Sequence, residues 1–257
     1  MGGAMLEGWL KSGADPQKIL ALDPKPPQEV ADVLTKHGIR LNPTVASITD
    51  AEVLVVAVKP QVMGEVLTGL VTLQKSKPLI LSIAAGKTIA NFETIFGEEA
   101  AVLRCMPNTP AAIGRGITAM VGNANVSHAQ LALAKRLLAT TGEVVEVERE
   151  DMIDLVTAVS GSGPAYVFYL VECLAQAGEK LGLSHDLAMK LARATVAGSG
   201  ELMRQSGTAA ATLRQNVTSP GGTTFAALQV LMADDGMEPL FERAIKAAAE
   251  RAKELSG

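Results

Sequence analysis

The pattern of the sequence changes near residue 150. Before this point, short apolar runs rich in β-branched residues alternate with amphipathic stretches, and after it only the helical period continues. Strands that alternate with helices at this spacing indicate a parallel sheet covered by helices on both faces. The sequence therefore predicts an α/β fold, with a doubly wound sheet over residues 1–150 and an all-α domain over residues 151–257.

Strands are predicted for the short runs 18–23, 51–58, 77–86, 100–106, 116–121 and 143–148. Helices are predicted for 26–38, 60–70, 127–142, 151–182, 184–207 and the segment that follows Gly222. The range 151–182 contains a Ser-Gly break. Ser184 and Pro239 have the residue types that favour the start of a helix, as a cap and as a first-turn residue.

The amino-terminal residues 1–13 predict a helix that no strand precedes. A doubly wound sheet normally begins with its central strand and a Gly-rich turn into the first helix. We therefore expect a Rossmann-like sheet whose first strand is absent from these residues. Gly2 and Asp23 have the spacing expected between that turn and the acidic residue that binds a ribose. A glycine at a helix start and an aspartate before a proline are also common in other folds.

The stretch "NVTSPGGTTFAAL" (216–228) places two glycines just ahead of an apolar helix. Ser219 is predicted as the N-cap and Pro220 as the first helical residue. Gly221 and Gly222 would then be the second and third residues, whose N–H groups have no intrahelical partner. Such N–H groups form an anion site when no side chain covers them. The alternative is an ordinary loop and helix start.

Composition narrows the class of protein. The 257 residues are 48% hydrophobic and only 3% aromatic, which predicts a core of aliphatic residues with close, Ala-rich helix packing. The net charge of −4 and the lack of a basic run argue against a nucleic-acid surface. No stretch reaches the roughly 18 apolar residues that span a bilayer, and no basic leader is visible.

Cysteine and histidine usage predicts a protein of a reducing compartment without a metal site. Cys105 and Cys173 both lie in apolar surroundings, which is typical of small core residues in a reduced compartment. The histidines are scattered, without cysteines or carboxylates at ligand spacing, so no metal site is expected. We expect a cytoplasmic protein without a membrane or nucleic-acid partner.

Four stretches occur together in one order: "AVKPQ" (57–61), "RCMPNTPAAIGRG" (104–116), "SGSGPAY" (160–166) and "LRQNVTSPGGTTFAALQVL" (213–231). Together they resemble the pyrroline-5-carboxylate reductases, which perform the last reduction of proline synthesis. The resemblance covers the whole chain, and the SPGGTT segment is its most specific part. It implies hydride transfer from a reduced nicotinamide to the C=N bond of 1-pyrroline-5-carboxylate. Family members usually begin with a strand and a complete G-x-G-x-x-G turn, of which only Met1 and Gly2 correspond here.

The resemblance also implies a substrate site. Its residues would be Asn216, Val217, Ser219, Gly221, Gly222 and Thr223, with the loop N–H groups and the Ser219 hydroxyl holding the substrate carboxylate. Thr224 would be the catalytic residue, as hydrogen-bond partner of the ring nitrogen and relay for a proton through water. Threonine is a poor general acid, so positioning is its expected role. Alternatively, its hydroxyl would only bond to its own helix backbone.

The cofactor site implied by the resemblance comprises Met1, Gly2, Asp23, Lys25, Ala57, Val58, Lys59, Pro60, Ala84, Ala85, Gly86, Asn108 and Thr109. Most of these residues follow predicted strands, where a doubly wound sheet presents its loops to a ligand. The alternatives are a solvated loop charge at Lys59, close helix–strand packing at 84–86, and an ordinary turn after a strand at 107–110. Gly161 and Gly163 would form either a kink between helices or an opening for the cofactor.

Cofactor preference depends on two neighbouring charges. Asp23 favours the free ribose hydroxyls of NADH because a carboxylate repels a 2′-phosphate, whereas Lys25 would pair with that phosphate. Members of the family commonly use NADPH, so we expect NADPH, with NADH as the alternative. The resemblance further implies that residues 151–257 bind substrate and interlock across a two-fold axis. A homodimer or a higher oligomer of dimers would result.

Two other functions fit parts of the pattern. A β-hydroxyacid dehydrogenase-like enzyme also joins a Rossmann half to a helical half, and it usually needs a catalytic lysine in the helical domain. Lys180 and Lys190 are the nearby candidates, and neither lies in a Gly-rich pattern. A dinucleotide-binding scaffold without catalytic activity is the third interpretation.

Overall fold

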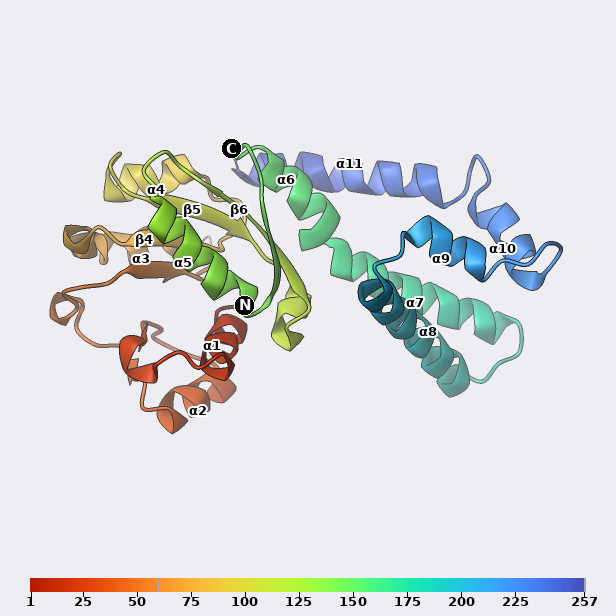
Figure 1. Ribbon diagram of the computed structural model, residues 1–257, viewed down its shortest axis with the longest axis horizontal. Coiled ribbons are helices and arrows are strands. Elements are labelled where there is room, and N and C mark those ends of the chain that lie inside the picture. The colour runs from red at the N-terminus through yellow and green to blue at the C-terminus, as the bar shows by residue number, and fades with distance from the viewer. Residues whose placement is uncertain (60, 257) are drawn as a thin grey trace. The chain divides into compact units, whose positions relative to one another are not determined.

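The computed structural model describes residues 1–59 and 61–256, and the chain divides into two compact units (Figure 1). The first unit comprises Met1–Gly161 together with the C-terminal stretch that starts at Ala249, and the second comprises Ser162–Ala248. The first unit is α/β and the second is helical, as predicted. The first unit extends past residue 150 because Ile153 is fully buried in its core.

The strands are β1 (Leu20–Ala21), β2 (Arg40–Leu41), β3 (Val53–Val56), β4 (Leu79–Ser82), β5 (Val102–Met106), β6 (Gly116–Gly122) and β7 (Gly142–Glu146). Each predicted run overlaps one of them. The unpredicted strand, β2, has only two residues, and both are exposed, so it carries no hydrophobic period.

The strands form two separate sheets. β1 and β2 pair in parallel, and β3 to β7 form a five-stranded sheet in chain order. β3, β4 and β5 are parallel, β6 is antiparallel to β5, and β7 is parallel to β6. This division is expected for a doubly wound sheet that lacks the central strand between its two halves.

The helices of the first unit are α1 (Gly2–Lys11), α2 (Gln28–Lys36), α3 (Met63–Thr68), α4 (Ile89–Phe96), α5 (His128–Ala139) and α6 (Met152–Val156). Short 3-10 segments occupy Pro16–Lys18, Val45–Ser47, Val71–Ser76 and Thr109–Ile113. Helix α4 lies outside the predicted ranges. A capping box formed by Thr88 and Asn91 fixes its start.

Helices cover both faces of the five-stranded sheet, with α5 on one of them (Figure 1). One core layer joins the sheet to α1 and α5, and the other joins it to α3, α4 and α6. Side chains alternate along β5, so that Leu103 and Cys105 belong to the first layer, and Val102 and Met106 to the second. The Trp9 Nε1–H also donates to the Leu137 carbonyl (2.9 Å), which fixes α1 against α5.

The helical unit contains α7 (Gly163–Lys180), α8 (His185–Ser206), α9 (Ala210–Asn216), α10 (Thr223–Leu231) and most of α11 (Met237–Ser256). Helix α9 lies outside the predicted ranges. Ser184 is the N-cap of α8 and Pro239 lies in the first turn of α11, as predicted. The buried contact between α7 and α8 consists of Ala175, Ala188 and Ala192, which is the close, Ala-rich packing expected from composition.

Large apolar side chains of the second unit are mostly exposed. The exposed set on α7, α8 and α10 includes Val167, Phe168, Tyr169, Leu170, Leu174, Leu187, Leu191, Leu202, Met203, Phe225, Val230 and Leu231. A surface of this extent is typical of an interface rather than of a free monomer. Among the described residues, no helix is both long and apolar enough to cross a membrane.

We predict that Gly142→Ala destabilises the first unit. Gly142 has a φ of +144°, and a Cβ there would overlap the carbonyl group of Gly116 in the neighbouring strand. We expect the free energy of unfolding to fall by about 2 kcal/mol or more, because the backbone of β6 or β7 must shift. Denaturant unfolding measures this change.

Gly64→Ala is the matched control. Gly64 lies in α3, and a Cβ there meets no atom of the other described side chains within 4 Å. Alanine is the better helix former by about 0.5–1 kcal/mol, so this variant should be at least as stable as the parent. Equal stability of the two variants would contradict the prediction.

Candidate active site

Three predicted cofactor loops meet at one edge of the five-stranded sheet. They are residues 57–59 after β3, 84–86 after β4 and 108–109 after β5. Since β3, β4 and β5 are parallel neighbours, their carboxyl ends lie side by side, which is where doubly wound sheets bind ligands. Pro60, also predicted for this site, lies outside the described residues.

The start of α1 lies against the first of these loops. A Cβ built on Gly2 would come within 3.1 Å of the Ala57 Cβ, so glycine permits this close approach. Met1 is the N-cap, but no side chain caps the helix. The first intrahelical bond runs from the Met5 N–H to the Met1 carbonyl (3.1 Å), which leaves three N–H groups for an anion. These donors fit a pyrophosphate group.

Asp23 and Lys25 lie in a tight turn after β1. Asp23 Oδ1 accepts the Lys25 N–H (2.9 Å), so the carboxylate is held by its own turn. Asn42 braces the turn with two bonds of 2.8 Å each, accepting the Asp23 N–H and donating to the Asp23 carbonyl. Sequence reasoning missed Asn42, whose φ of +52° is a conformation that Asn and Gly favour.

The loop 84–86 is held from several sides. Ser82 Oγ accepts the Ala84 N–H (3.2 Å), and Ala84 is buried. Gly86 has a φ of +68°, and a Cβ there would lie 2.8 Å from the Leu255 carbonyl oxygen. Glycine therefore allows both the backbone conformation and the contact with the end of α11. Close packing, the alternative reading of these small residues, is present here.

Asn108 connects parts of the first unit. Its Oδ1 accepts the Ile117 N–H (3.0 Å) and its Nδ2 donates to the Ser160 carbonyl (3.2 Å). An amide has four hydrogen-bonding positions, so one donor and one acceptor position remain for a ligand. Thr109 begins the 3-10 segment that follows.

The Ser-Gly break forms a π-helical turn. Thr157–Gly161 is π-helical and links α6 to α7, and the first compact unit ends there at Gly161. Single π turns inside helices are frequent at functional sites. Gly161 ends this turn and Gly163 begins α7, and both readings of these glycines stay predictions.

The loop 216–224 differs from its prediction. Helix α10 begins at Thr223 with Gly222 as its N-cap, so the prediction of Ser219 as the N-cap was wrong. Residues 219–222 instead form a turn closed by the Gly222 N–H and the Ser219 carbonyl (3.0 Å). Gly221 has a φ of +69°, and with Pro220 before it the turn fits type II geometry. A Cβ on Gly222 would lie 2.6 Å from Ser219 Oγ.

Because α10 begins at Thr223, the N–H groups that could bind an anion belong to later residues than predicted. The first bond within α10 runs from the Ala226 N–H to the Gly222 carbonyl (3.1 Å), so the N–H groups of Thr223, Thr224 and Phe225 have no intrahelical partner. No side chain caps them. Thr224 is half-buried, and within the described part of the chain its hydroxyl makes no hydrogen bond, so the backbone-bonded alternative is not observed.

The other predicted substrate residues lie just before this turn. Asn216 ends α9 and Val217 is its C-cap, with 66% of the Val217 side chain exposed. Ser219 and Gly221 are exposed as well. The structure thus brings all the predicted substrate residues onto one short, open segment of the helical unit.

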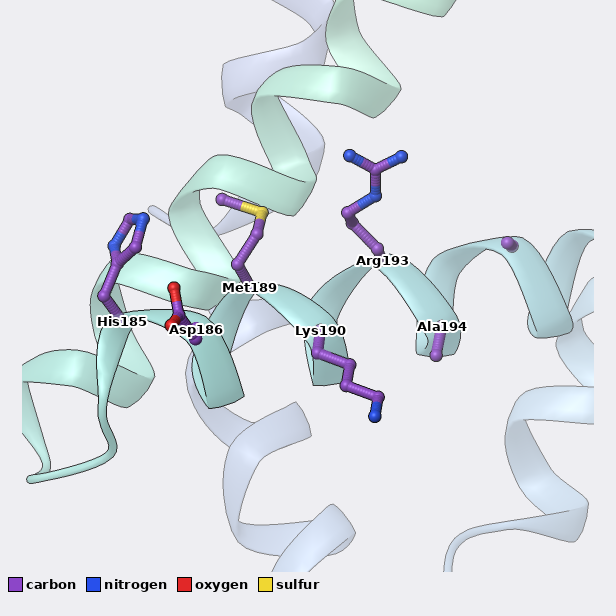
Figure 2. A pocket seen from close by; sticks show the side chains of 7 residues that line it. His185, Asp186, Met189, Lys190, Arg193 and Ala194 are labelled. Atoms are coloured by element: carbon purple, nitrogen blue, oxygen red, sulfur yellow. The ribbon is translucent and has the colours of Figure 1, made fainter.

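An open groove of about 560 Å³ runs along α8 (Figure 2). Its lining residues are His185, Asp186, Met189, Lys190, Arg193, Ala194 and Ala197. None of them belongs to the predicted cofactor or substrate residues. Lys190, one lysine of the dehydrogenase-like alternative, lines this groove, whereas Lys180 does not. The exposed apolar residues of this helix, such as Leu187 and Leu191, do not line the groove.

Comparison with known proteins gives two family matches. Residues 150–255 match the family described as "Pyrroline-5-carboxylate reductase dimerisation". Residues 1–86 match the one described as "NADP oxidoreductase coenzyme F420-dependent". The dimerisation match begins at the predicted domain boundary and supports self-association of the chain.

Full-length relatives agree with these matches. The chain is 41% identical over 257 residues to the pyrroline-5-carboxylate reductase of Pseudomonas aeruginosa, covering 100% of this chain and 93% of that protein. A solved pyrroline-5-carboxylate reductase from Coxiella burnetii is 35% identical with a TM-score of 0.92, covering 100% and 95% of the two chains.

A second similar solved structure contains bound NADP. The Plasmodium falciparum pyrroline carboxylate reductase with NADP bound is 28% identical with a TM-score of 0.83, again covering 100% and 95% of the two chains. The resemblance seen in the four sequence stretches is therefore confirmed along the whole length of the chain. The chain belongs to the pyrroline-5-carboxylate reductase family.

Proposed function

We propose that this chain catalyses the NAD(P)H-dependent reduction of 1-pyrroline-5-carboxylate to L-proline, the last step of proline biosynthesis. The observation that carries the proposal is the start of α10 after the turn at 219–222. Its first N–H groups and the Thr224 hydroxyl have no hydrogen-bond partner among the described residues. A helix start of this kind suits a small carboxylate such as that of the substrate. The full-length similarity to reductases of this name supports the same reaction.

The substrate carboxylate is held by backbone donors at the start of α10. Thr223 and Thr224 supply N–H groups, and Gly222 has no side chain to shield them. The exposed Ser219 hydroxyl is available as a further donor. Asn216 and Val217 complete the segment at the end of α9. The positive end of the helix dipole stabilises the carboxylate in addition to the individual hydrogen bonds.

Thr224 orients the ring nitrogen. The bound nicotinamide supplies the hydride for the C=N carbon, so the protein must position the imine and control its proton. A neutral hydroxyl can donate or accept one hydrogen bond at the nitrogen, which is protonated in the product. Because threonine is a poor acid, Thr224 acts by positioning, and water carries the proton.

Residues 1–150 form the dinucleotide-binding domain in this proposal. The uncapped start of α1 at Met1 and Gly2 receives the pyrophosphate, and the turn at Asp23 and Lys25 receives the adenosine ribose. The loops 57–60, 84–86 and 108–109 receive the rest of the cofactor. NADPH is the preferred form, with NADH as the alternative. The NADP named in the Plasmodium falciparum structure and in the N-terminal family match supports this preference.

Residues 151–257 bind substrate and form the dimer in this proposal. The exposed apolar side chains of α7, α8 and α10 supply an interface, and higher oligomers arise from pairs of such dimers. Cys105 is buried as predicted, whereas Cys173 is exposed, so the prediction of a core position was wrong for Cys173. Both are free thiols, which suits a reducing compartment such as the cytoplasm.

The first prediction of this proposal concerns Thr224. The parent chain should oxidise NADPH in the presence of 1-pyrroline-5-carboxylate, followed at 340 nm. We expect Thr224→Ala to lower kcat/KM by about 10- to 100-fold, as for a lost hydrogen bond to a charged group. Thr224→Ser keeps the hydroxyl and should retain most of the activity. Thr35→Ala, on exposed α2, is the matched control. Full activity of Thr224→Ala would contradict the role of this hydroxyl.

The second prediction concerns cofactor choice. Asp23→Ser should raise the ratio of kcat/KM for NADPH over NADH by about fivefold, because about 1 kcal/mol of repulsion from a 2′-phosphate is removed. Serine can keep the turn, since its hydroxyl also accepts a nearby N–H. Lys25→Ala should lower the same ratio. An unchanged ratio in both variants would exclude this turn from the cofactor site. Asp15→Ser is the surface control and should leave the ratio unchanged.

The third prediction concerns self-association. Phe168 on α7 is 60% exposed, and Phe168→Asp should place a charge in the proposed interface. We expect the sedimentation coefficient to shift towards the monomer, because an unpaired buried charge is costly. Val145→Glu replaces an exposed apolar residue of the first unit and should leave the assembly intact. An unchanged dimer in Phe168→Asp would place the interface elsewhere.

A further inference from the structure

Arg104 is a buried charge on the central strand β5. Its side chain is only 2% exposed, and it points to the same face of the sheet as Val102 and Met106. Most of its neighbours on that face are apolar, and Ser82, in register on β4, is a polar one. A guanidinium in such a place requires ionic and hydrogen-bonding partners, because an unpaired buried charge is very costly. The single charge in "AAVLRCM" was the signal that sequence reasoning left unused.

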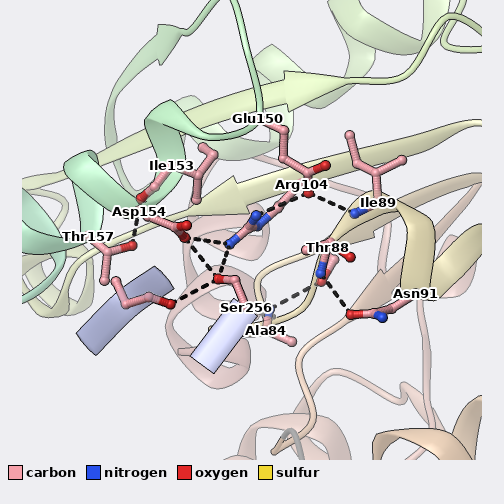
Figure 3. A network of polar contacts seen from close by, with 12 residues as sticks. Ala84, Thr88, Ile89, Asn91, Arg104, Glu150, Ile153, Asp154, Thr157 and Ser256 are labelled. Carbon is pink, nitrogen blue, oxygen red and sulfur yellow. Dashed lines mark hydrogen bonds and ion pairs between the residues drawn. The ribbon is translucent and has the colours of Figure 1, made fainter. Parts of the chain in front are cut away.

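The partners of Arg104 come from distant parts of the chain (Figure 3). One terminal nitrogen of its guanidinium lies 3.0 Å from Glu150 Oε1, and the other lies 3.2 Å from Asp154 Oδ1 and 3.3 Å from Ser256 Oγ. The Ser256 hydroxyl also donates to Asp154 Oδ1 (2.9 Å). Arg104 thus joins the start of α6 to the last turn of α11.

Glu150 extends this network to the start of α4. Its Oε1 accepts the Ile89 N–H at 2.7 Å, in addition to the bond from Arg104. Ile89 is the first residue of α4, and Lys87 and Thr88 join this helix to the loop 84–86. The ion pair therefore fixes the point at which the chain leaves the loop.

The network also fixes the helix end that contacts the loop. Ser256 neighbours Leu255, whose carbonyl oxygen faces Gly86 at a distance that leaves no room for a Cβ. On the strand side, Arg104 pairs in register with Ser82, and Ser82 Oγ accepts the Ala84 N–H. Groups that Arg104 contacts or neighbours therefore surround the loop 84–86. Ser82 lies before the loop, Glu150 binds the start of the helix after it, and the end of α11 covers Gly86.

We propose that Arg104, acting through Glu150, Asp154 and Ser256, is a positioning residue that holds the loop 84–86 in the shape that receives the cofactor. The inference rests on the proposed role of this loop in binding NADPH. A buried ion pair is often no more stabilising than apolar residues of similar size, so its main consequence here is geometric. The planar guanidinium fixes the directions of two carboxylates, which a single ammonium point charge does not.

The test compares cofactor affinity with stability. Glu150→Gln keeps the shape of the side chain but removes its charge, and Ser256→Ala removes one hydroxyl. We expect each to raise the Kd for NADPH by about three- to tenfold, as for one lost hydrogen bond. The KM for 1-pyrroline-5-carboxylate and kcat at saturating NADPH should stay within about twofold of the parent, because the reacting groups are not touched. Fluorescence titration and steady-state kinetics measure these quantities.

Arg104 itself is tested by a pair of variants. Arg104→Met removes both ion pairs, and Arg104→Lys retains a charge that reaches one carboxylate at a time, so lysine should recover part of the lost affinity. If Arg104→Met does not fold, the milder variants of Glu150 and Ser256 decide the question. Arg149→Met is the matched control, since Arg149 forms an exposed pair with Asp151 next to Glu150. It should leave the Kd unchanged.

The outcomes separate the inference from the function on which it rests. If Glu150→Gln and Ser256→Ala fold and bind NADPH as the parent does, or lose only thermal stability, the positioning role is overturned. Gly86→Ala tests the loop directly, because a Cβ there would lie 2.8 Å from the Leu255 carbonyl oxygen. An unchanged Kd in that variant removes the loop from the cofactor site. A parent chain that does not bind NADPH overturns the proposed function and the inference with it.

Discussion

Parallel hydrogen bonding between β3, β4 and β5 is the constraint on which the candidate cofactor site depends. Because these strands run in one direction and in a matched register, the loops after Val56, Ser82 and Met106 emerge at one edge of the sheet. Parallel strands need helical crossovers, and those crossovers bury both faces. The side chains of the strands therefore pack in the core, and the loops at the strand ends are the parts that can contact a ligand.

The two candidate binding segments share one feature, which is a set of backbone N–H groups at the start of a helix. Helices α1 and α10 both begin without a side-chain cap, at Met1 and Gly222. Each start is shaped by a glycine, since Gly2 permits the approach to Ala57 and Gly221 permits the turn before Thr223. The same physical device, free donors at the positive end of a helix, suits a pyrophosphate in one unit and a carboxylate in the other.

Local sequence rules predicted the elements better than their junctions. The apolar runs that became β4, β5 and β6 were recognisable, because strands buried on both faces are largely hydrophobic. Ser-Pro-Gly-Gly fits two local structures, a helix N-terminus and a type II turn, and no propensity distinguishes them. The network of Arg104 could not be predicted, since its partners are up to 152 positions away. Only the lone charge in an apolar strand marked it.

The exposed apolar surface of the second unit links assembly to the substrate segment. Its own core contains small alanines, which leave the large side chains of α7, α8 and α10 without cover. Val230 and Phe225 are 71% and 43% exposed on α10, the helix that starts at the proposed carboxylate site. Covering them in a dimer would restrain α10 and so fix Thr223 and Thr224. The partner subunit would thereby hold rigid the helix that is proposed to bind the substrate.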